Sequence, residues 1–239
     1  MTALSGRASS AEVARSRPSL ALLPIGSFEQ HGPHLPLWTD ALIAATVADL
    51  VADRLGAMVL PTIPYGTSAE HRGLPGSVWL REETLASMVE DVVVSCAGSI
   101  TSRIAVLSGH GGNWVLRPAV RAINARYPGL SVGLVPEAVL WGDVLAGDLH
   151  AGAVETSIVM HLQPDAVGSL PDDFVPDAPR EALDLLSMRE LTPDGVWGFP
   201  SKASAASGTE TVDQMAARVH QYLITTFVEL ATRREQSTP

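Results

Sequence analysis

Residues 20–40, LALLPIGSFEQHGPHLPLWTD, place a short apolar run, a loop rich in metal-ligand types and the start of a helix in direct succession. The run at 20–25 is continuous and bounded by Gly26, which is typical of a strand buried on both faces. Gly32, Pro33 and Pro36 exclude a helix or a regular strand in the middle of the stretch. Carboxylates and imidazoles stand between them: Glu29, His31, His34 and Asp40. A loop with this content at the end of a buried strand is more often a site than a linker.

The same order of strand and helix continues along the chain and predicts the fold class. Apolar runs predict strands, and apolar residues at intervals of three or four predict helices. The expected strands are 20–25, 58–60, 103–107 and 131–135, and the expected helices between them are 40–55, 82–99 and 113–127. Strands that alternate with helices indicate an α/β fold with a parallel sheet and right-handed crossovers.

After residue 136 the pattern is less regular. Helices are expected at 154–162, 181–191 and 209–233, a loop or short helix at 141–150, and loops at 164–179 and 195–208. No linker divides the sequence, so we expect a single catalytic domain at 19–232. Residues 1–18 and 233–239 are expected to be a flexible N-terminal arm and a flexible tail.

Composition narrows the class of protein. The chain has 239 residues and a net charge of −10, and its basic residues form no cluster, which argues against a nucleic-acid or anionic-membrane partner. Cys96 is the single cysteine, so there is no internal disulfide, and a cytoplasmic location fits. No apolar run is long enough to span a bilayer, and the N-terminus lacks the apolar region of a secretory signal.

Polar clusters follow the predicted strands, where open parallel sheets bind their ligands. The clusters are Glu29 and His31 with Asp40, the segment 68–77 (SAEHRGLPGS), His110 in SGHGGN, and His150 with Glu155 in HAGAVETS. Carboxylates and imidazoles from different loops are a binding set for Zn²⁺, Mn²⁺ or Fe²⁺. Carboxylates beyond the minimum would support two ions with one bridging carboxylate.

Each of these residues also has a structural explanation when taken alone. Asp40 is a good N-cap for the helix that follows it, and Asn113 is a suitable cap for the next one. Glu155 favours a helix N-terminus through its charge. His34 and His71 are compatible with ordinary loop positions. The joint occurrence at successive strand ends favours a site.

Several blocks together resemble the creatininase (creatinine amidohydrolase) family. They are PIGSFEQHGPHLPLWTD, YGTSAEHRGLPGS, LSGHGGN, HAGAVETS and KASAASGTE, and they extend over nearly the whole chain. The resemblance implies a three-layer α/β sandwich with a mostly parallel sheet flanked by helices. It also implies one or two divalent metal ions (Zn, Mn or Fe) and hydrolysis of a C–N amide bond in a small molecule or a peptide. Members of the family are commonly homo-oligomers, often hexamers.

The resemblance also implies roles for individual residues. Glu29, His31, Asp40 and His110 match the metal ligands of the family, with Asp40 as the bridging carboxylate. Glu155 is expected on or beside the metals, as a ligand or as a general base. His150 is expected near the substrate, with a near-neutral pKa that suits proton donation to the leaving nitrogen. The expected substrate-binding residues are His34, His71, Ser77, Trp79, Gly111 and Asn113.

The chain departs from the creatinine-hydrolysing members. Those carry Tyr and Glu where this chain has Gly111 and Gly112, so the second metal site loses a carboxylate. Trp79 stands in place of a small polar residue that contacts substrate. We therefore expect a metal-dependent amidohydrolase that cleaves a cyclic amide, a formamide or a similar small amide rather than creatinine. The alternatives are a mycofactocin-type precursor peptide peptidase and a non-catalytic metal-binding homologue. Serine hydrolysis is disfavoured, because no G-x-S-x-G elbow follows a strand.

Overall fold

A four-stranded parallel sheet lies at the centre of the computed structural model, which describes residues 4–142 and 147–237. The strands have the order β2-β1-β3-β4, so β1 and β3 pair along the middle of the sheet. Their bounds are β1 Ala21–Ile25, β2 Met58–Val59, β3 Arg103–Ser108 and β4 Ser131–Leu134. The four expected strands and their parallel arrangement are confirmed.

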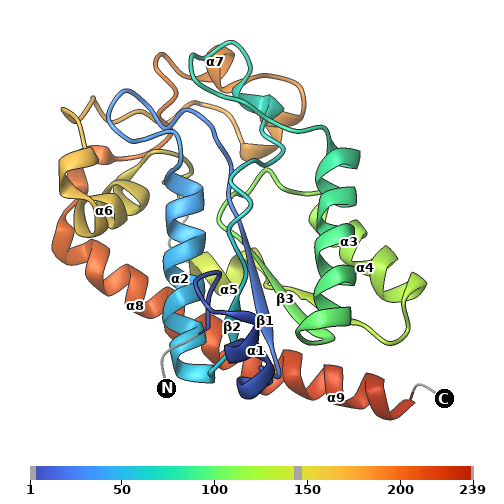
Figure 1. The fold of residues 1–239 in the computed structure, drawn as a ribbon. Coiled ribbons are helices and arrows are strands. Elements are labelled where there is room, and N and C mark those ends of the chain that lie inside the picture. The colour runs from blue at the N-terminus through green and yellow to red at the C-terminus, as the bar shows by residue number, and fades with distance from the viewer. Residues whose placement is uncertain (1–3, 143–146, 238–239) are drawn as a thin grey trace.

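Helices cover both faces of the sheet, which makes the three-layer sandwich that was expected (Figure 1). Alternation along β1 sends Leu22 into one core and Leu23 into the other, as the pleat of a strand requires. The first core is shared with α2 Thr39–Leu55, α5 Glu137–Trp141, α6 Ala153–Leu162 and α8 Ala205–Tyr222. The second core is shared with α3 Glu82–Ser99 and α4 Leu116–Arg126.

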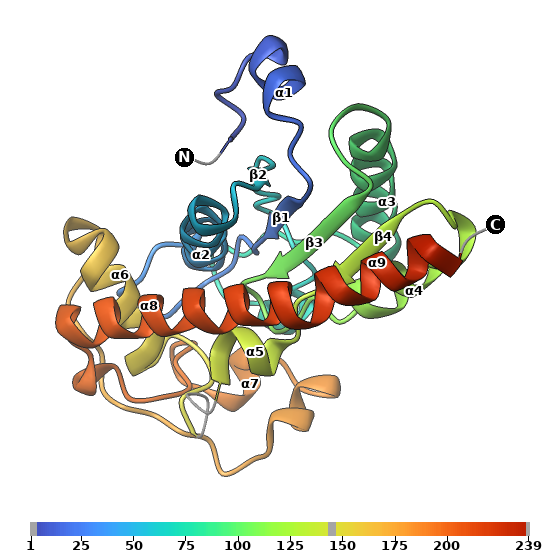
Figure 2. The ribbon, with the colours of Figure 1, turned by 90° about the horizontal axis from the view of Figure 1, so that it is seen from below.

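Two expected helices differ in the structure. The expected helix at 181–191 is a 3₁₀ turn, Arg180–Asp184, followed by the short α7, Met188–Leu191. The break occurs at Ser187, whose hydroxyl and backbone N–H both contact the Glu190 carboxylate in a capping box that starts a new helix. The expected helix at 209–233 is longer: α8 passes through a π-helical turn, Leu223–Phe227, into α9, Val228–Ser237. Figure 2 shows α8 and α9 as one long rod below the sheet.

The two chain ends contain helices within the described residues. α1, Ser10–Ser16, starts with a capping box between Ser9 and Glu12 inside the segment expected to be an arm. α9 likewise extends into the expected tail. The flexibility of both segments stays a prediction, and residues 143–146 of the expected loop at 141–150 lie outside the described residues. No helix in the described part of the chain is both long and apolar enough to cross a membrane.

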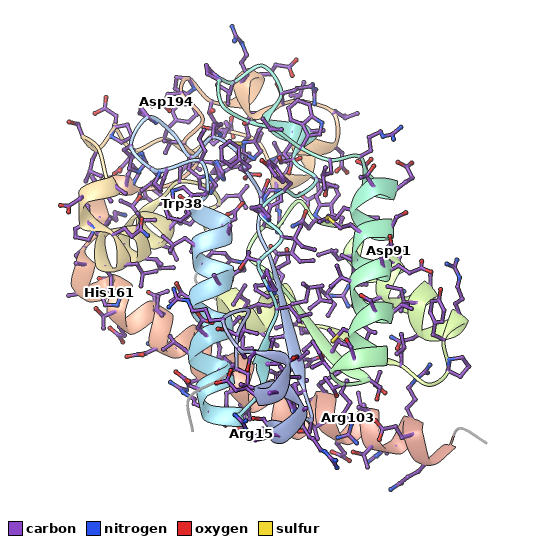
Figure 3. The ribbon with its side chains drawn as sticks, viewed as in Figure 1. Arg15, Trp38, Asp91, Arg103, His161 and Asp194 are labelled. Carbon is purple, nitrogen blue, oxygen red and sulfur yellow. The ribbon has the colours of Figure 1, made fainter. Side chains whose placement is uncertain are left out.

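Tight backbone contacts bring the strand ends next to α2. A Cβ atom at Gly109, just after β3, would lie 2.4 Å from the backbone oxygen of Asp40. The end of β3 therefore passes directly beside the first turn of α2, which places His110 next to Asp40. Loops gather at this carboxyl end of the sheet, where Trp38 and Asp194 lie, whereas Arg103 lies at the opposite end (Figure 3).

Candidate metal centre

Glu29, Asp40 and His110 form the first group of ligands. His110 Nδ1 lies 3.2 Å from Glu29 Oε1 and 3.2 Å from Asp40 Oδ2. Within the described residues, both Glu29 carboxylate oxygens and Asp40 Oδ2 are buried without a hydrogen-bond partner. Leaving a buried carboxylate unpaired is costly, and buried charges are normally paired or bound to metals. These orphaned oxygens are the observation that best fits a bound cation.

The protonation of the His110 ring points to the same conclusion. Its Nε2 faces two acceptors, the Thr67 carbonyl oxygen at 3.1 Å and Glu70 Oε1 at 3.4 Å. Nε2 therefore carries the proton in the neutral ring, and the Nδ1 lone pair faces Glu29 and Asp40. A lone pair and two carboxylate oxygens repel one another unless a cation lies between them. A spacing near 3 Å suits ligand atoms that are each about 2 Å from one ion.

His31, Asp40 and Glu155 form a second group that shares Asp40 with the first. His31 Nε2 lies 3.2 Å from Asp40 Oδ1 and 3.8 Å from Glu155 Oε1. His31 Nδ1 donates to the Glu29 carbonyl oxygen at 3.1 Å, so Nε2 presents its lone pair. The Ala151 N–H donates to Glu155 Oε2 at 2.6 Å and holds that carboxylate in place. One Asp40 oxygen faces each group, as a bridging carboxylate would.

His150 lies between the two groups. Its Nε2 is 2.7 Å from the Gln30 carbonyl oxygen, to which it donates, so Nδ1 carries the lone pair and lies 3.8 Å from Glu29 Oε1. Burial and the neighbouring His31 lower the pKa of His150 to about 3. The expectation of a near-neutral pKa is therefore wrong. His150 is neutral at physiological pH, and its Nδ1 lone pair is suited to bind an ion or to accept a hydrogen bond.

His71 also joins the cluster, although the sequence placed it among the substrate-binding residues. Its Nε2 lies 3.1 Å from Glu29 Oε1, and Glu29, His71 and His150 offer ligand atoms within 4.8 Å of one another. The Gln30 side chain determines which nitrogen of the His71 ring carries the proton. Gln30 Oε1 accepts from Gly32 N–H at 2.9 Å, so its Nε2 amide group, 2.8 Å from His71 Nδ1, is the donor to that ring. His71 Nδ1 therefore accepts a hydrogen bond, and Nε2 carries the proton that faces Glu29, so the neutral ring pairs with Glu29 and has no free nitrogen for an ion.

The carboxylates and imidazoles of the cluster shift one another's pKa values. Burial alone would raise the pKa of Glu29, but His110 and His71 hold that pKa well below its usual range. Burial alone would lower the pKa of His31, but Asp40 and Glu155 hold it well above the usual 6.5, and Glu29 does the same for the pKa of His110. In the metal-free protein, protons on the two imidazoles thus compensate the carboxylates. A divalent cation would replace those protons.

A cavity of about 480 Å³ opens onto this cluster. Its described lining includes the ligand candidates Asp40, His110, His150 and Glu155, the apolar residues Trp114, Trp141, Leu183 and Met188, and the charged residues Glu70 and Arg180. Of the six expected substrate-binding residues, His71 and Gly111 line the cavity. The other four are not among the described residues that line it, and Trp79 is 40% exposed.

Three of those four form hydrogen bonds that connect separate segments of the chain. His34 Nε2 contacts Thr156 Oγ1 on α6 at 2.9 Å, and Ser77 Oγ accepts from the Gln30 N–H at 3.0 Å. The Asn113 amide accepts from Thr67 N–H at 2.8 Å and donates to the Gly26 carbonyl oxygen at 3.1 Å.

Two predicted helix caps are wrong. The N-cap of α4 is Val115 rather than Asn113, and the N-cap of α2 is Trp38. Asp40 lies in the first turn of α2, so its carboxylate is free to face the two groups of ligands.

The sequence patterns did not identify Gln30, Asp148 or Arg180, and they included Glu70 only as a member of the segment 68–77. Asp148 Oδ1 accepts from the N–H groups of Ala153 and Phe199 at 2.8 and 2.9 Å, which ties the start of α6 to a distant loop. Arg180 Nη1 pairs with Glu137 at 2.9 Å beside the cavity. The position of Gln30 between Glu29 and His31 is the one local signal. The others depend on contacts between segments far apart in the sequence.

Comparisons with known proteins identify the family of the chain. The family model for creatininase, described as creatinine amidohydrolase, matches residues 7–223. A mycofactocin precursor peptide peptidase from Mycolicibacterium smegmatis is 37% identical over 219 residues, 85% of this chain and 85% of that protein. A creatinine amidohydrolase from Pseudomonas putida is 28% identical over 173 residues, 61% of this chain and 65% of that protein. A crystal structure of creatinine amidohydrolase (creatininase) matches with a TM-score of 0.81 at 22% identity, over 95% of this chain and 99% of that chain, which shows likeness of fold.

Proposed function

Because this chain belongs to the creatininase family, we propose that it is a metal-dependent peptidase that hydrolyses a C–N bond of a precursor peptide. The similarity to the mycofactocin precursor peptide peptidase carries the proposal, since it is higher and covers more of the chain than the similarity to creatinine amidohydrolase. Among the functions that the sequence left open, this observation favours the peptidase over the hydrolase of a small amide.

The shape of the cavity supports a peptide substrate. Its volume of about 480 Å³ lies within the usual range of ligand pockets. Trp114 lines it and is 57% exposed, so one wall continues to the molecular surface. One end of a peptide would lie against the metal centre, and the remainder would extend past Trp114. Trp141, at 4% exposure, forms a buried part of the wall.

The residues of the site would have two tasks, to hold the metal ions and to contact the substrate. Glu29, Asp40 and His110 would hold one divalent ion, and His31, Asp40 and Glu155 a second. Such ions acidify water and polarise a carbonyl oxygen. The free Nδ1 of His150 faces the centre, and because its ring is neutral at physiological pH it would bind an ion or accept a hydrogen bond from the substrate. The Ala151 N–H holds Glu155 with one oxygen turned inward. Burial of Glu29 and His31 keeps bulk water from screening these charges.

The test compares peptides with small amides as substrates. Protein stripped of metal and reconstituted with Zn²⁺, Mn²⁺ or Fe²⁺ is incubated with a mixed peptide library, and products are identified by mass spectrometry. Creatinine and other cyclic amides are assayed in parallel. We expect cleavage of peptides that chelation abolishes and metal restores. Turnover of a small amide with no peptide cleaved would contradict the proposal, and an apo form as active as the holo form would remove the metal mechanism.

A further inference from the structure

Glu70 reaches the metal centre from the segment 68–77, a predicted polar cluster in which no role was assigned to this residue. Its side chain is 19% exposed, lines the cavity and places Oε1 3.4 Å from His110 Nε2. That nitrogen is on the side of the ring opposite Nδ1, which faces Glu29 and Asp40. We propose that Glu70 is a positioning residue that accepts a hydrogen bond from His110 Nε2–H and so keeps the Nδ1 lone pair turned toward the metal centre. The inference rests on the proposed metal-dependent function.

Gly112 provides the space for this contact. A Cβ atom there would lie 2.0 Å from Glu70 Oε1 and 2.3 Å from His110 Nε2. Gly112 is not among the glycines with a positive φ, so its backbone conformation does not require glycine. The absence of a side chain at this position therefore serves the approach of Glu70 to His110. A side chain on residue 112 would displace one of the two partners.

The Glu70 carboxylate adds a negative charge, which the neighbouring Thr67 carbonyl group lacks. The Thr67 carbonyl oxygen already lies 3.1 Å from His110 Nε2, so the proton has a neutral acceptor. A second acceptor that carries charge makes a stronger hydrogen bond and raises the basicity of the opposite ring nitrogen. Glu70 would thereby strengthen the interaction of His110 with a cation. Carboxylates behind metal-binding histidines commonly play this part.

Glu70 acts through His110 and not as a ligand itself. Glu70 Oε1 approaches His110 at Nε2, at 3.4 Å, whereas Glu29 and Asp40 approach the same ring at Nδ1. Its carboxylate lies behind the His110 ring as seen from Glu29 and Asp40. Removal of Glu70 should therefore weaken binding of an ion only while His110 is present.

The experiment measures metal affinity rather than turnover. Purified metal-free protein is titrated with Zn²⁺ against a chromogenic chelator, and the dissociation constants of wild type, E70A and E70Q are compared. We expect E70A to weaken binding of one ion by about 10- to 100-fold, as is typical when the hydrogen-bond partner of a metal-binding histidine is removed. E70Q keeps an acceptor oxygen and should lose less. The exposed Glu83 at the start of α3 provides a matched control, and E83Q should bind as wild type does.

A double-mutant cycle separates this role from general disruption. E70A should have little further effect in an H110A background, because the two residues act as one unit. Circular dichroism of the metal-free variants checks folding, and the nearly isosteric E70Q keeps the test valid if E70A misfolds. Unchanged Zn²⁺ affinity in E70A, or effects of E70A and H110A that add, would overturn the inference and leave the proposed function standing. A wild-type protein that binds no Zn²⁺ would overturn both.

Discussion

Asp40 Oδ2 lies 3.2 Å from His110 Nδ1, while Asp40 Oδ1 lies 3.2 Å from His31 Nε2. One carboxylate thus connects two imidazoles from different loops. It can do so because it lies in the first turn of α2 and makes no capping hydrogen bond with its side chain. The contact between Gly109 and the Asp40 backbone holds the two loops together at this point.

Replacing the bridging carboxylate should remove metal binding without unfolding the protein. D40N is expected to lose both ions and to reduce turnover by more than about 100-fold, since loss of a ligand exceeds the effect of a residue behind one. The metal-free variant should be less stable than metal-free wild type but still folded, because Asp40 pairs with the protonated His31 in the absence of metal. Metal content is measured by mass spectrometry and stability by urea unfolding. D91N, on the exposed side of α3, is the control. Retention of both ions by D40N would contradict a bridging role.

Stability of the metal-free protein should fall as the pH rises above 6.5. The carboxylates hold the pKa values of His31 and His110 well above the usual 6.5, despite burial. A histidine whose pKa is higher in the folded state contributes its full stabilisation at pH values below the unfolded pKa. This stabilisation is lost as the pH rises through the folded pKa. Calorimetry in chelator from about pH 7 to 9 should show a falling Tm, and the range starts above 6.5 because the lowered pKa values of His34 and His150 make stability rise with pH below that point. Saturating Zn²⁺ should flatten this dependence, and a Tm that rises with pH would refute the assignment.

Close backbone packing at Gly109 should make it intolerant of a side chain. G109A would force a Cβ atom to within 2.4 Å of the Asp40 carbonyl oxygen and should cost about 1–3 kcal/mol of unfolding free energy. Gly98 in α3 is a matched control, because a Cβ atom there would meet nothing within 4 Å. G98A should stabilise the helix by about 0.5–1 kcal/mol. Urea unfolding measures both, and equal effects of the two changes would contradict the packing argument.

Asp148 should matter for the geometry of His150 and Glu155 rather than for the first group of ligands. Its two oxygens accept three backbone N–H groups, from Ala153, Val154 and Phe199. D148A leaves these donors unpaired and should destabilise the fold by about 1–3 kcal/mol.

Turnover of D148A should fall further than the loss of folded protein explains, while at least one ion stays bound. Zn²⁺ titration beside a kinetic assay tests this. D148A with wild-type turnover per folded molecule would show that Asp148 is structural only.

The sequence by itself determined the alternation of strands and helices and the set of residues that converge at one edge of the sheet. Glu29, His31, Asp40, His110 and His150 could be predicted to meet, because parallel strands deliver their carboxyl ends to one side. The hydrophobic pattern also determined both faces of β1, since each residue of a strand points opposite to its neighbours.

Only the tertiary structure decided what the individual side chains do. Asn113 was expected as a cap but braces Thr67, and His34 faces α6 instead of the cavity. Glu70 and His110 meet although 40 residues separate them. The conformations of these loops depend on hydrogen bonds to distant segments, which local spacing does not encode. The direction in which each imidazole presents its lone pair likewise depends on acceptors that folding alone brings near.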